Sequence, residues 1–391
     1  MADYLTADEA AAYLGVSRAT LYAYVSRGLV VSEPTRDSRS HRYPRSALDE
    51  LRDRRERRRE PDLGARNALR WGAPMLDSTI TLIADGRLWY RGRDARELSR
   101  TATFEQVACL LWTGAMDHAA ELFLRSPSPR RKLRADRSFA DLLVASLVER
   151  RAEPAVTIAE PSVAALRAAA RVVRQLFEAA GARGRGTLAE RLARGWSAPS
   201  AEDLDAALIL CADHELNTSS FTARCVASTD APLENVLLAA LCALEGRRHG
   251  GAVNQDVEEL LRSAERDGVQ RACRKAVSRS GGLPGFGAAH PLYPRGDPRA
   301  EELLSRIALS ERAPLSQIIA FGREELGLYP GTEFALAALA RAAALPPGIA
   351  FALFALGRSA GWIAHALETA AEGRLIRPRA RYVGPAPRVA W

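Results

Sequence analysis

Apolar residues recur at helical spacing through most of the chain. Between residues 163 and 177 they stand three or four positions apart, at Val163, Leu166, Ala170, Val173 and Phe177. This spacing puts them on one face of a helix, which can then bury that face in a core. Similar patterns extend from residue 64 to the C-terminus in an Ala- and Leu-rich sequence. We therefore expect an all-α protein.

One segment has a strand pattern instead. Residues 78–83 read Ser-Thr-Ile-Thr-Leu-Ile, and Arg-Leu-Trp-Tyr90 follows after Ala-Asp-Gly. β-Branched and apolar residues on both sides of an Asp-Gly pair are typical of a hairpin with a two-residue turn. A short β-hairpin turning at Asp85-Gly86 is predicted.

The first 60 residues have the pattern of a separate small domain. Thr6 precedes a helical stretch and Glu9 follows three residues later, which predicts a capping box. Gly15 supplies a turn, and Ser17 caps a second helix over residues 18–25. Two short helices joined by a glycine turn make a helix-turn-helix, whose second helix normally enters the major groove of DNA. Residues 40–43 and 46–51 predict a wing and a third helix, so this domain resembles the MerR-type and excisionase-type winged helix-turn-helix.

The helix-turn-helix brings candidate DNA contacts with it. They are Ser17, Arg18, Thr20 and Tyr22 on the second helix and Arg42 in the wing. The arginine-rich run 52–59 could neutralise phosphates, although its two acidic residues also suit a solvated helix face. The net charge of +8 is weak support for DNA, because almost all of the positive charge is arginine and can reflect genome composition. Docking of a protein or dimerisation is the alternative role.

A Pro- and Gly-containing joint at residues 60–64 separates this domain, 1–60, from the remainder, 61–391. No apolar run approaches the roughly 18 residues that span a membrane, and the N-terminus lacks the pattern of a signal peptide. A cytoplasmic protein without a membrane partner is expected. The five cysteines include no Cys-x-x-Cys pair, so no metal site is expected.

Three histidines stand in loops that are rich in glycine or charge rather than on apolar faces: His214, His249 and His290. Glycine lets a backbone approach a ligand closely, and histidine is the usual proton carrier near neutral pH. Three such loops in one chain favour a shared substrate site over three separate structural histidines.

The segments around these histidines carry a family resemblance. The chain has His214-Glu-x-Asn-x-Ser followed by Phe and Arg, a Gly-x-x-His249-Gly-Gly-Ala loop, and Gly-Phe-Gly before Asp-Pro-Arg299-Ala. Nearer the C-terminus stand Arg358-x-x-Gly-Trp-Ile-Ala-His and Arg377-Pro-Arg. These motifs follow one another in the order found in citrate synthases, and residues 64–391 resemble that family.

The resemblance implies a fold and a reaction. The fold would have a large helical subdomain that forms a homodimer and a smaller mobile subdomain over about residues 254–350. The enzyme would be an acyltransferase that condenses acetyl-CoA with oxaloacetate and hydrolyses the thioester to citrate and CoA. It would need no cofactor and no metal, because acetyl-CoA is a substrate.

The resemblance also implies the role of each site residue. His249 would hydrogen-bond the thioester oxygen, His290 would polarise the ketone, and a carboxylate would remove the methyl proton. That carboxylate would be Glu333. Oxaloacetate would be held by His214, by arginines that can grip its carboxylates, and by one arginine from the partner subunit. The arginines are Arg299 and Arg358, with Arg377 reaching across from the partner.

Three loops depart from the family pattern. Gly331-Thr-Glu-Phe334 replaces Asn-Val-Asp-Phe, two alanines precede His290, and Val253 is inserted after an unusual Arg247-Arg248 pair. Glu333 also suits a plain helix N-terminus, which favours acidic residues. Three functions therefore stay open: citrate synthase, 2-methylcitrate synthase using propionyl-CoA, and a catalytically impaired DNA-binding regulator that senses a metabolite. An active enzyme whose N-terminal domain docks a protein is a further combination.

Overall fold

The computed structural model describes residues 4–26, 29–34, 41–45, 47–49, 51, 76–123, 137–151, 162–287, 293, 296–308, 310, 313–380 and 382–385. The chain divides into two compact units, Met1–Asp77 and Ser78–Trp391. Each unit has its own hydrophobic core.

The N-terminal unit is the predicted winged helix-turn-helix. It contains α1 (Ala7–Leu14), α2 (Arg18–Ser26) and a three-stranded antiparallel sheet in the order β1 (Tyr4–Leu5), β3 (His41–Pro44), β2 (Glu33–Pro34). Thr6 and Glu9 form the expected capping box. Gly15, at a φ of 60°, ends α1 in the left-handed conformation that glycine adopts readily. Leu21 on α2 and Tyr43 on the wing are buried in one small core.

The larger unit begins with the predicted hairpin. Strands β4 (Thr81–Ala84) and β5 (Arg87–Tyr90) pair in the register Thr81 to Tyr90 and Ala84 to Arg87. Asp85 and Gly86 both have positive φ, 53° and 72°, as a two-residue hairpin turn of this kind requires. A short third strand that the sequence did not indicate, β6 (Arg93–Asp94), pairs with β5.

The rest of the unit is helical, as expected. Its helices are α5 (Ala95–Thr101), α6 (Phe104–Thr113), α7 (Ala119–Leu122), α8 (Phe139–Arg150), α9 (Val163–Ala179), α10 (Leu188–Trp196), α11 (Ala201–Cys211), α12 (Thr218–Ala227), α13 (Leu233–Leu244), α14 (Gly250–Asp267), α15 (Val269–Ser280), α16 (Pro298–Ser305), α17 (Pro314–Leu326), α18 (Thr332–Ala342) and α19 (Ile349–Glu372). The apolar stripe of α9 faces the core from Leu166 onward, whereas Val163 in the first turn is exposed.

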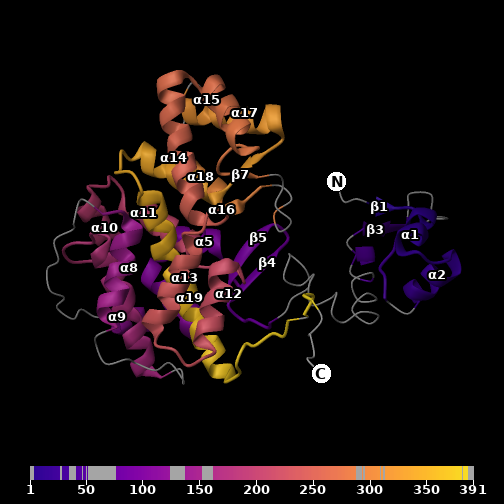
Figure 1. The fold of residues 1–391 in the computed structure, drawn as a ribbon, viewed down its shortest axis with the longest axis horizontal. Coiled ribbons are helices and arrows are strands. Elements are labelled where there is room, and N and C mark those ends of the chain that lie inside the picture. The colour runs from indigo at the N-terminus through magenta and orange to yellow at the C-terminus, as the bar shows by residue number, and fades with distance from the viewer. Residues whose placement is uncertain are drawn as a thin grey trace. The chain divides into compact units, whose positions relative to one another are not determined.

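Helix α19 runs through the centre of this unit and packs against α11, α12 and α13 (Figure 1). Among the described residues it alone is long and apolar enough to cross a membrane, but it is buried inside the protein along its apolar length. Two glycines bring it close to α11. A Cβ at Gly357 would lie 2.5 Å from the Leu208 carbonyl oxygen, and one at Gly361 would lie 2.3 Å from that of Ala212. Any larger residue would push the two helices apart.

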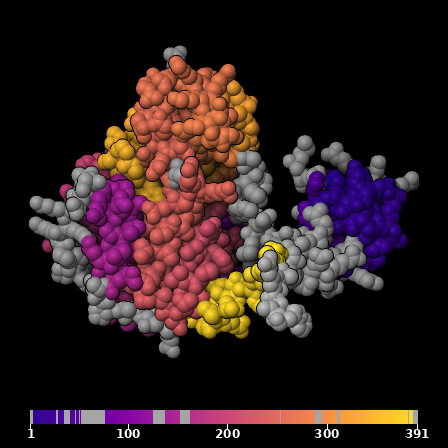
Figure 2. Space-filling model, in the orientation of Figure 1, coloured from indigo at the N-terminus to yellow at the C-terminus, as the bar shows by residue number. Residues whose placement is uncertain are grey.

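Helices α14 to α18 gather at one end of the unit with the antiparallel pair β7 (Phe286–Gly287) and β8 (Tyr329–Pro330) (Figure 1). These elements lie mostly within the smaller subdomain expected over about residues 254–350, which stays a prediction. Beyond α19 the C-terminal segment lies on the surface, visible in yellow in Figure 2.

Candidate active site

The first predicted site histidine stands in the turn between α11 and α12. Asn217 ends this turn, because its side-chain oxygen accepts hydrogen bonds from the backbone N–H groups of Ser219 (3.0 Å) and Ser220 (3.1 Å). Such an N-cap fixes where α12 begins. His214 is half-buried, and its Nε2 lies 2.9 Å from the hydroxyl of buried Tyr293. The local capping pattern thus holds the histidine at the joint of two helices.

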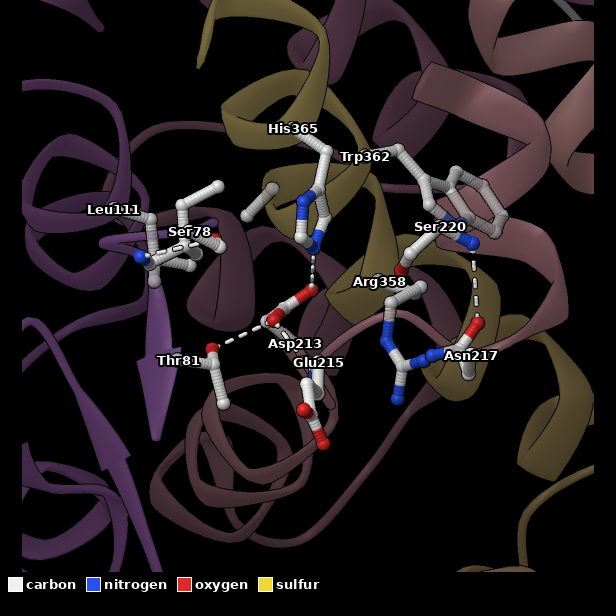
Figure 3. Close-up of polar contacts among 12 residues, drawn as sticks. Ser78, Thr81, Leu111, Asp213, Glu215, Asn217, Ser220, Arg358, Trp362 and His365 are labelled. Carbon is white, nitrogen blue, oxygen red and sulfur yellow. Dashed lines mark hydrogen bonds and ion pairs between the residues drawn. The ribbon is translucent and has the colours of Figure 1, made fainter. Parts of the chain in front are cut away.

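Helix α19 makes a hydrogen bond to each of the three residues that precede His214. Arg358 Nε donates to the Cys211 carbonyl oxygen (2.7 Å), and the Gly361 N–H donates to that of Ala212 (2.9 Å). His365 Nε2 lies 3.1 Å from Asp213 Oδ1 (Figure 3). Arg358, Gly361 and His365 are spaced by three and four residues, so they share one helix face. The position of the turn is therefore set by α19.

Arg358 is positioned to bind an anion. Its side chain is 1% exposed and lies over the ring of Phe354, 4.9 Å from the centroid. Burial lowers the pKa of Arg358, while the nearby Asp213 carboxylate acts in the opposite direction. Its two terminal nitrogens have no hydrogen-bond partner among the residues that the structure describes. A guanidinium with both terminal nitrogens free can grip a carboxylate with two parallel hydrogen bonds.

Arg299, at the start of α16, is already partly engaged. Its Nε and one terminal nitrogen donate to the two carboxylate oxygens of Asp297, at 3.0 and 2.7 Å. Asp297 also accepts from the Thr332 hydroxyl at 2.9 Å. Although burial acts in the opposite direction, the Asp297 charge holds the pKa of Arg299 above its ordinary value. One terminal nitrogen has no hydrogen-bond partner among the described residues, so Arg299 has fewer donors for a ligand than Arg358.

Contacts connect the charged site residues in two places. Arg358 Nε donates to the Cys211 carbonyl oxygen at the end of α11. Asp297, the partner of Arg299, accepts from the hydroxyl of Thr332, the residue before Glu333. Burial raises the pKa of the Cys211 thiol to about 12; Arg358 and Arg299 act to lower it, and Glu333 acts to raise it. Glu333 is the second residue of α18, half-buried, and has no hydrogen bond or ion pair with any described residue. Glu333 therefore follows directly the residue that joins α18 to the ion pair of Arg299, and its role in the site stays a prediction.

His249 faces this region from the N-terminus of α14. Its Nε2 lies 3.1 Å from the Ser219 hydroxyl, which also accepts from Trp362 Nε1 (3.1 Å). Burial, and to a smaller extent the charge of Arg358, lower the pKa of His249 to about 4. The ring is therefore neutral at pH 7. The Ser219 hydroxyl donates its one hydrogen to Asn217 Oδ1 at 2.8 Å, so it accepts from Nε2 of His249, and the hydrogen of the neutral ring is on Nε2 in this arrangement.

Two predicted residues are not seen in the site. His290 lies outside the described residues. Arg377 is exposed in the segment after α19, and no hydrogen bond or ion pair joins it to another described residue. No hydrogen bond links Glu333 to His249 within the described part of the chain. Within the described residues, Glu333 on α18 and His249 at the start of α14 therefore belong to separate parts of the site that no hydrogen bond connects.

Several contributing residues were missed in the sequence. Tyr293 follows His290 by three positions, and Trp362 and His365 belong to a motif that was noted only for Arg358. Ser219 was noted only as the serine of the His214 motif. Position in a motif was the only signal for these residues, since their partners lie up to 152 residues away.

The candidate DNA contacts are mostly occupied by neighbours in the N-terminal unit. Arg18 pairs with Asp8, and Arg42 pairs with Glu33 (2.9 Å). Ser17 caps α2 by accepting from the Thr20 N–H at 3.2 Å, while Tyr22 is 52% exposed. Exposed ion pairs contribute about 0–1 kcal/mol, so a phosphate can replace the acidic partner at little cost.

Comparisons with known proteins give the family of each part of the chain. Residues 68–379 match the citrate synthase C-terminal domain family, and residues 4–56 match a helix-turn-helix domain family. Citrate synthase of Haloferax volcanii is 32% identical over 345 residues, which cover 76% of this chain and 90% of that protein. The 2-methylcitrate synthase of Mycobacterium tuberculosis is 29% identical, covering 77% of this chain and 86% of that protein.

Solved structures show the same fold. Citrate synthase from Thermotoga maritima superimposes with a TM-score of 0.64 at 25% identity, covering 82% of this chain and 96% of that one. The enzyme from Thermoplasma acidophilum, solved as a complex with carboxymethyl coenzyme A and oxaloacetate, gives 0.66 at 24% identity, covering 81% and 96%. The resemblance inferred from the motifs is confirmed, and the chain belongs to the citrate synthase family, with a helix-turn-helix domain at its N-terminus.

Proposed function

We propose that the chain is a citrate synthase that condenses acetyl-CoA with oxaloacetate and hydrolyses the resulting thioester to citrate and CoA. The observation that carries the proposal is the buried Arg358 at the end of α11, whose two terminal nitrogens have no hydrogen-bond partner among the described residues. Oxaloacetate has two carboxylates, and arginine is the side chain best suited to hold them. The reaction needs no metal or cofactor, and a cytoplasmic location stays a prediction.

Oxaloacetate binding is assigned to four residues. Arg358 grips one carboxylate with its two free terminal nitrogens, and Arg299 contributes its remaining one. His214, held by Tyr293 at 2.9 Å, hydrogen-bonds the substrate from the turn after α11. Arg377 reaches the site of a partner subunit, which makes the active form a homodimer. Its exposure in a segment beyond α19 is compatible with that role.

Catalysis begins at the acyl group. Glu333 removes a proton from the acetyl methyl group, and His249 donates a hydrogen bond to the thioester oxygen as negative charge develops there. A neutral imidazole has one N–H, so this bond uses Nδ1–H after the Ser219 hydroxyl turns from Asn217 to donate to Nε2 of His249. The carbanion equivalent attacks the oxaloacetate ketone, His290 protonates the new alkoxide, and water cleaves the thioester to release CoA. Closure of the smaller subdomain would bring Glu333 to His249 and exclude bulk water.

Thiol release tests the proposal directly. Purified protein is mixed with oxaloacetate and acetyl-CoA, and free CoA is followed with a thiol reagent. The wild type should release CoA only when both substrates are present. Glu333→Gln should lower kcat at least 100-fold, because the amide cannot accept the methyl proton. Glu324→Gln, an exposed glutamate on α17, is the matched control and should leave kcat unchanged. No release by the wild type at high enzyme concentration would end the proposal.

A second candidate reaction uses propionyl-CoA and yields 2-methylcitrate. Relatives named citrate synthase and 2-methylcitrate synthase match the chain at similar identity, 32% and 29%. A single methylene changes binding in a pocket by only about 1–3 kcal/mol, so the two acyl-CoAs must be compared side by side. A larger kcat/KM for propionyl-CoA would assign the chain to this second reaction.

The N-terminal domain motivates a regulatory candidate. A catalytically impaired synthase fold would sense oxaloacetate or CoA and alter DNA binding by Ser17, Arg18, Thr20, Tyr22 and Arg42. Two such domains in a homodimer would suit a palindromic site. The match of residues 4–56 to a helix-turn-helix family supports testing it. Salt-dependent binding to DNA upstream of its own gene, changed by either metabolite, would favour the regulator. Failure to retain such fragments at low salt would exclude it.

A further inference from the structure

His365 has no task in the chemistry proposed above, yet it is one of the most enclosed polar residues of the larger unit. It is fully buried on α19, in the middle of a chain of polar contacts. Its Nδ1 lies 3.0 Å from Arg224 Nε, and its Nε2 lies 3.1 Å from Asp213 Oδ1 (Figure 3). A buried network of polar side chains is stable only when each polar group has a hydrogen-bond partner, and such a network holds its members rigidly. This points to a positional role for His365.

The two contacts fix which nitrogen of His365 carries hydrogen. Arg224 has only N–H donors, so Nδ1 must accept the hydrogen bond from Nε of Arg224. The ring hydrogen is then on Nε2, where it is donated to Asp213. Arg224 is itself fully buried and held by Glu368 and, at 3.5 Å, by Glu372. Orientation and tautomer of the ring are thus both imposed from α12 and α19.

Asp213 is locked by this donor together with two others. Its carboxylate accepts from the Thr81 hydroxyl (2.6 Å) and from the Glu215 N–H (3.1 Å). A Cβ at Gly361 would lie 2.4 Å from Asp213 Oδ1, so the carboxylate fills the space against α19. Although burial favours the neutral acid, the interactions with His365, the Arg358 charge and the bond from Thr81 lower the pKa of Asp213. The carboxylate is therefore ionised, and the residue has no room to rotate.

We infer that His365 is a positioning residue for oxaloacetate, acting through Asp213. The His365–Asp213 hydrogen bond fixes the end of α11, and the next residue, His214, takes its place in the pocket from that fixed point. The charge of the Asp213 carboxylate also acts on Arg358, so the position of Asp213 influences the electrostatic potential at the guanidinium proposed to bind oxaloacetate. His365 itself touches neither substrate. This inference rests on the proposed synthase reaction.

Three variants separate positioning from a general structural role. His365→Phe keeps the ring but removes the donor, whereas His365→Gln can still donate to Asp213. Thr369→Val, one turn further along α19, is the matched buried control, because its hydroxyl oxygen is enclosed without a partner among the described residues. Steady-state kcat and both KM values are measured for each variant, together with the unfolding midpoint.

The expected result is a change confined to one substrate. His365→Phe should raise KM for oxaloacetate about 10- to 100-fold, the usual effect of a lost hydrogen bond to a charged group. KM for acetyl-CoA should change less than about threefold. His365→Gln should recover most of the loss, and Thr369→Val should match the wild type. A folded His365→Phe variant with unchanged KM for oxaloacetate, or with both KM values raised equally, would overturn the inference.

Two further measurements keep the test decisive. If His365→Phe does not fold, Asp213→Asn takes its place, since one amide oxygen can still accept from Thr81 and Glu215. It should raise KM for oxaloacetate at least tenfold, and a value within threefold of wild type would refute the inference.

If the wild type releases no thiol, the proposed function fails, and calorimetric titration with oxaloacetate is used instead. Weaker binding by His365→Phe would then still support positioning, and equal binding by both proteins would reject it.

Discussion

Replacing Arg358 by lysine tests how the structure binds the substrate carboxylate. Arg358 makes two contacts: Nε donates to the Cys211 carbonyl oxygen at 2.7 Å, and the guanidinium lies over the Phe354 ring. Its two terminal nitrogens have no hydrogen-bond partner among the described residues. A lysine keeps the charge but has a single nitrogen. That nitrogen can replace the bond to Cys211 or reach the substrate, and it cannot form the two-pronged grip.

The size of the effect follows from the bonds lost. At least one of two charge-assisted hydrogen bonds to oxaloacetate disappears, at about 2 kcal/mol, which corresponds to roughly a 30-fold rise in KM. The Arg358→Lys variant should show this rise for oxaloacetate, with KM for acetyl-CoA within about threefold of wild type. Thiol-release kinetics with each substrate varied in turn give both values.

One outcome contradicts the reasoning. If Arg358→Lys folds with an unchanged unfolding midpoint and binds oxaloacetate as tightly as the wild type, the terminal nitrogens of Arg358 do not hold the substrate. The carboxylate would then have to be bound elsewhere, and the assignment of this pocket would be wrong.

Three other predictions concern packing, protonation and assembly. Gly361→Ala should lower the free energy of unfolding in urea by about 2–3 kcal/mol, because its Cβ would lie 2.3 Å from the Ala212 carbonyl oxygen. Gly282→Ala is the control: a Cβ there meets open space, so the free energy of unfolding should change little. Burial raises the pKa of Asp205 from 3.8 to about 7, so its contribution to stability is full below pH 3.8 and is lost as pH rises through 7. Asp205→Asn should therefore stabilise the protein at pH 8, by at most about 4 kcal/mol, and have little effect at pH 4. Co-expressing inactive Arg377→Ala and Glu333→Gln chains should restore roughly a quarter of wild-type activity if each site in a twofold dimer borrows Arg377 from its partner; no recovery in verified heterodimers would refute that arrangement.

Local features were predicted well because their causes are local. The capping box of Thr6 and Glu9, and the turn at Asp85-Gly86, depend on residues within a few positions of each other. The start and stop of such elements can be inferred from spacing alone. The family motifs also pointed to Arg358, which the structure places at the Cys211 carbonyl oxygen.

Contacts between distant segments were not predictable in the same way. Whether Ser219 meets His249, or His365 meets Asp213, depends on how closely α19 crosses its neighbours. That distance is set by glycines, and a glycine in a sequence does not say which helix will press against it. The same limit applies to Arg299, whose bidentate pairing with Asp297 leaves it less free than its motif suggested.

The anchoring of Thr79 to helix α19 indicates where the chain can be divided. Its N–H and hydroxyl both donate to Glu368, at 2.7 and 2.8 Å, and Glu368 also holds Arg224. The first residues of the larger unit are therefore fastened to its central helix. A truncation that begins at Ser78 would retain this fastening, whereas one that begins at Ile80 would leave Glu368 with a single cationic partner. Any isolated synthase unit, or any fusion that exchanges the N-terminal domain, is best joined ahead of that threonine.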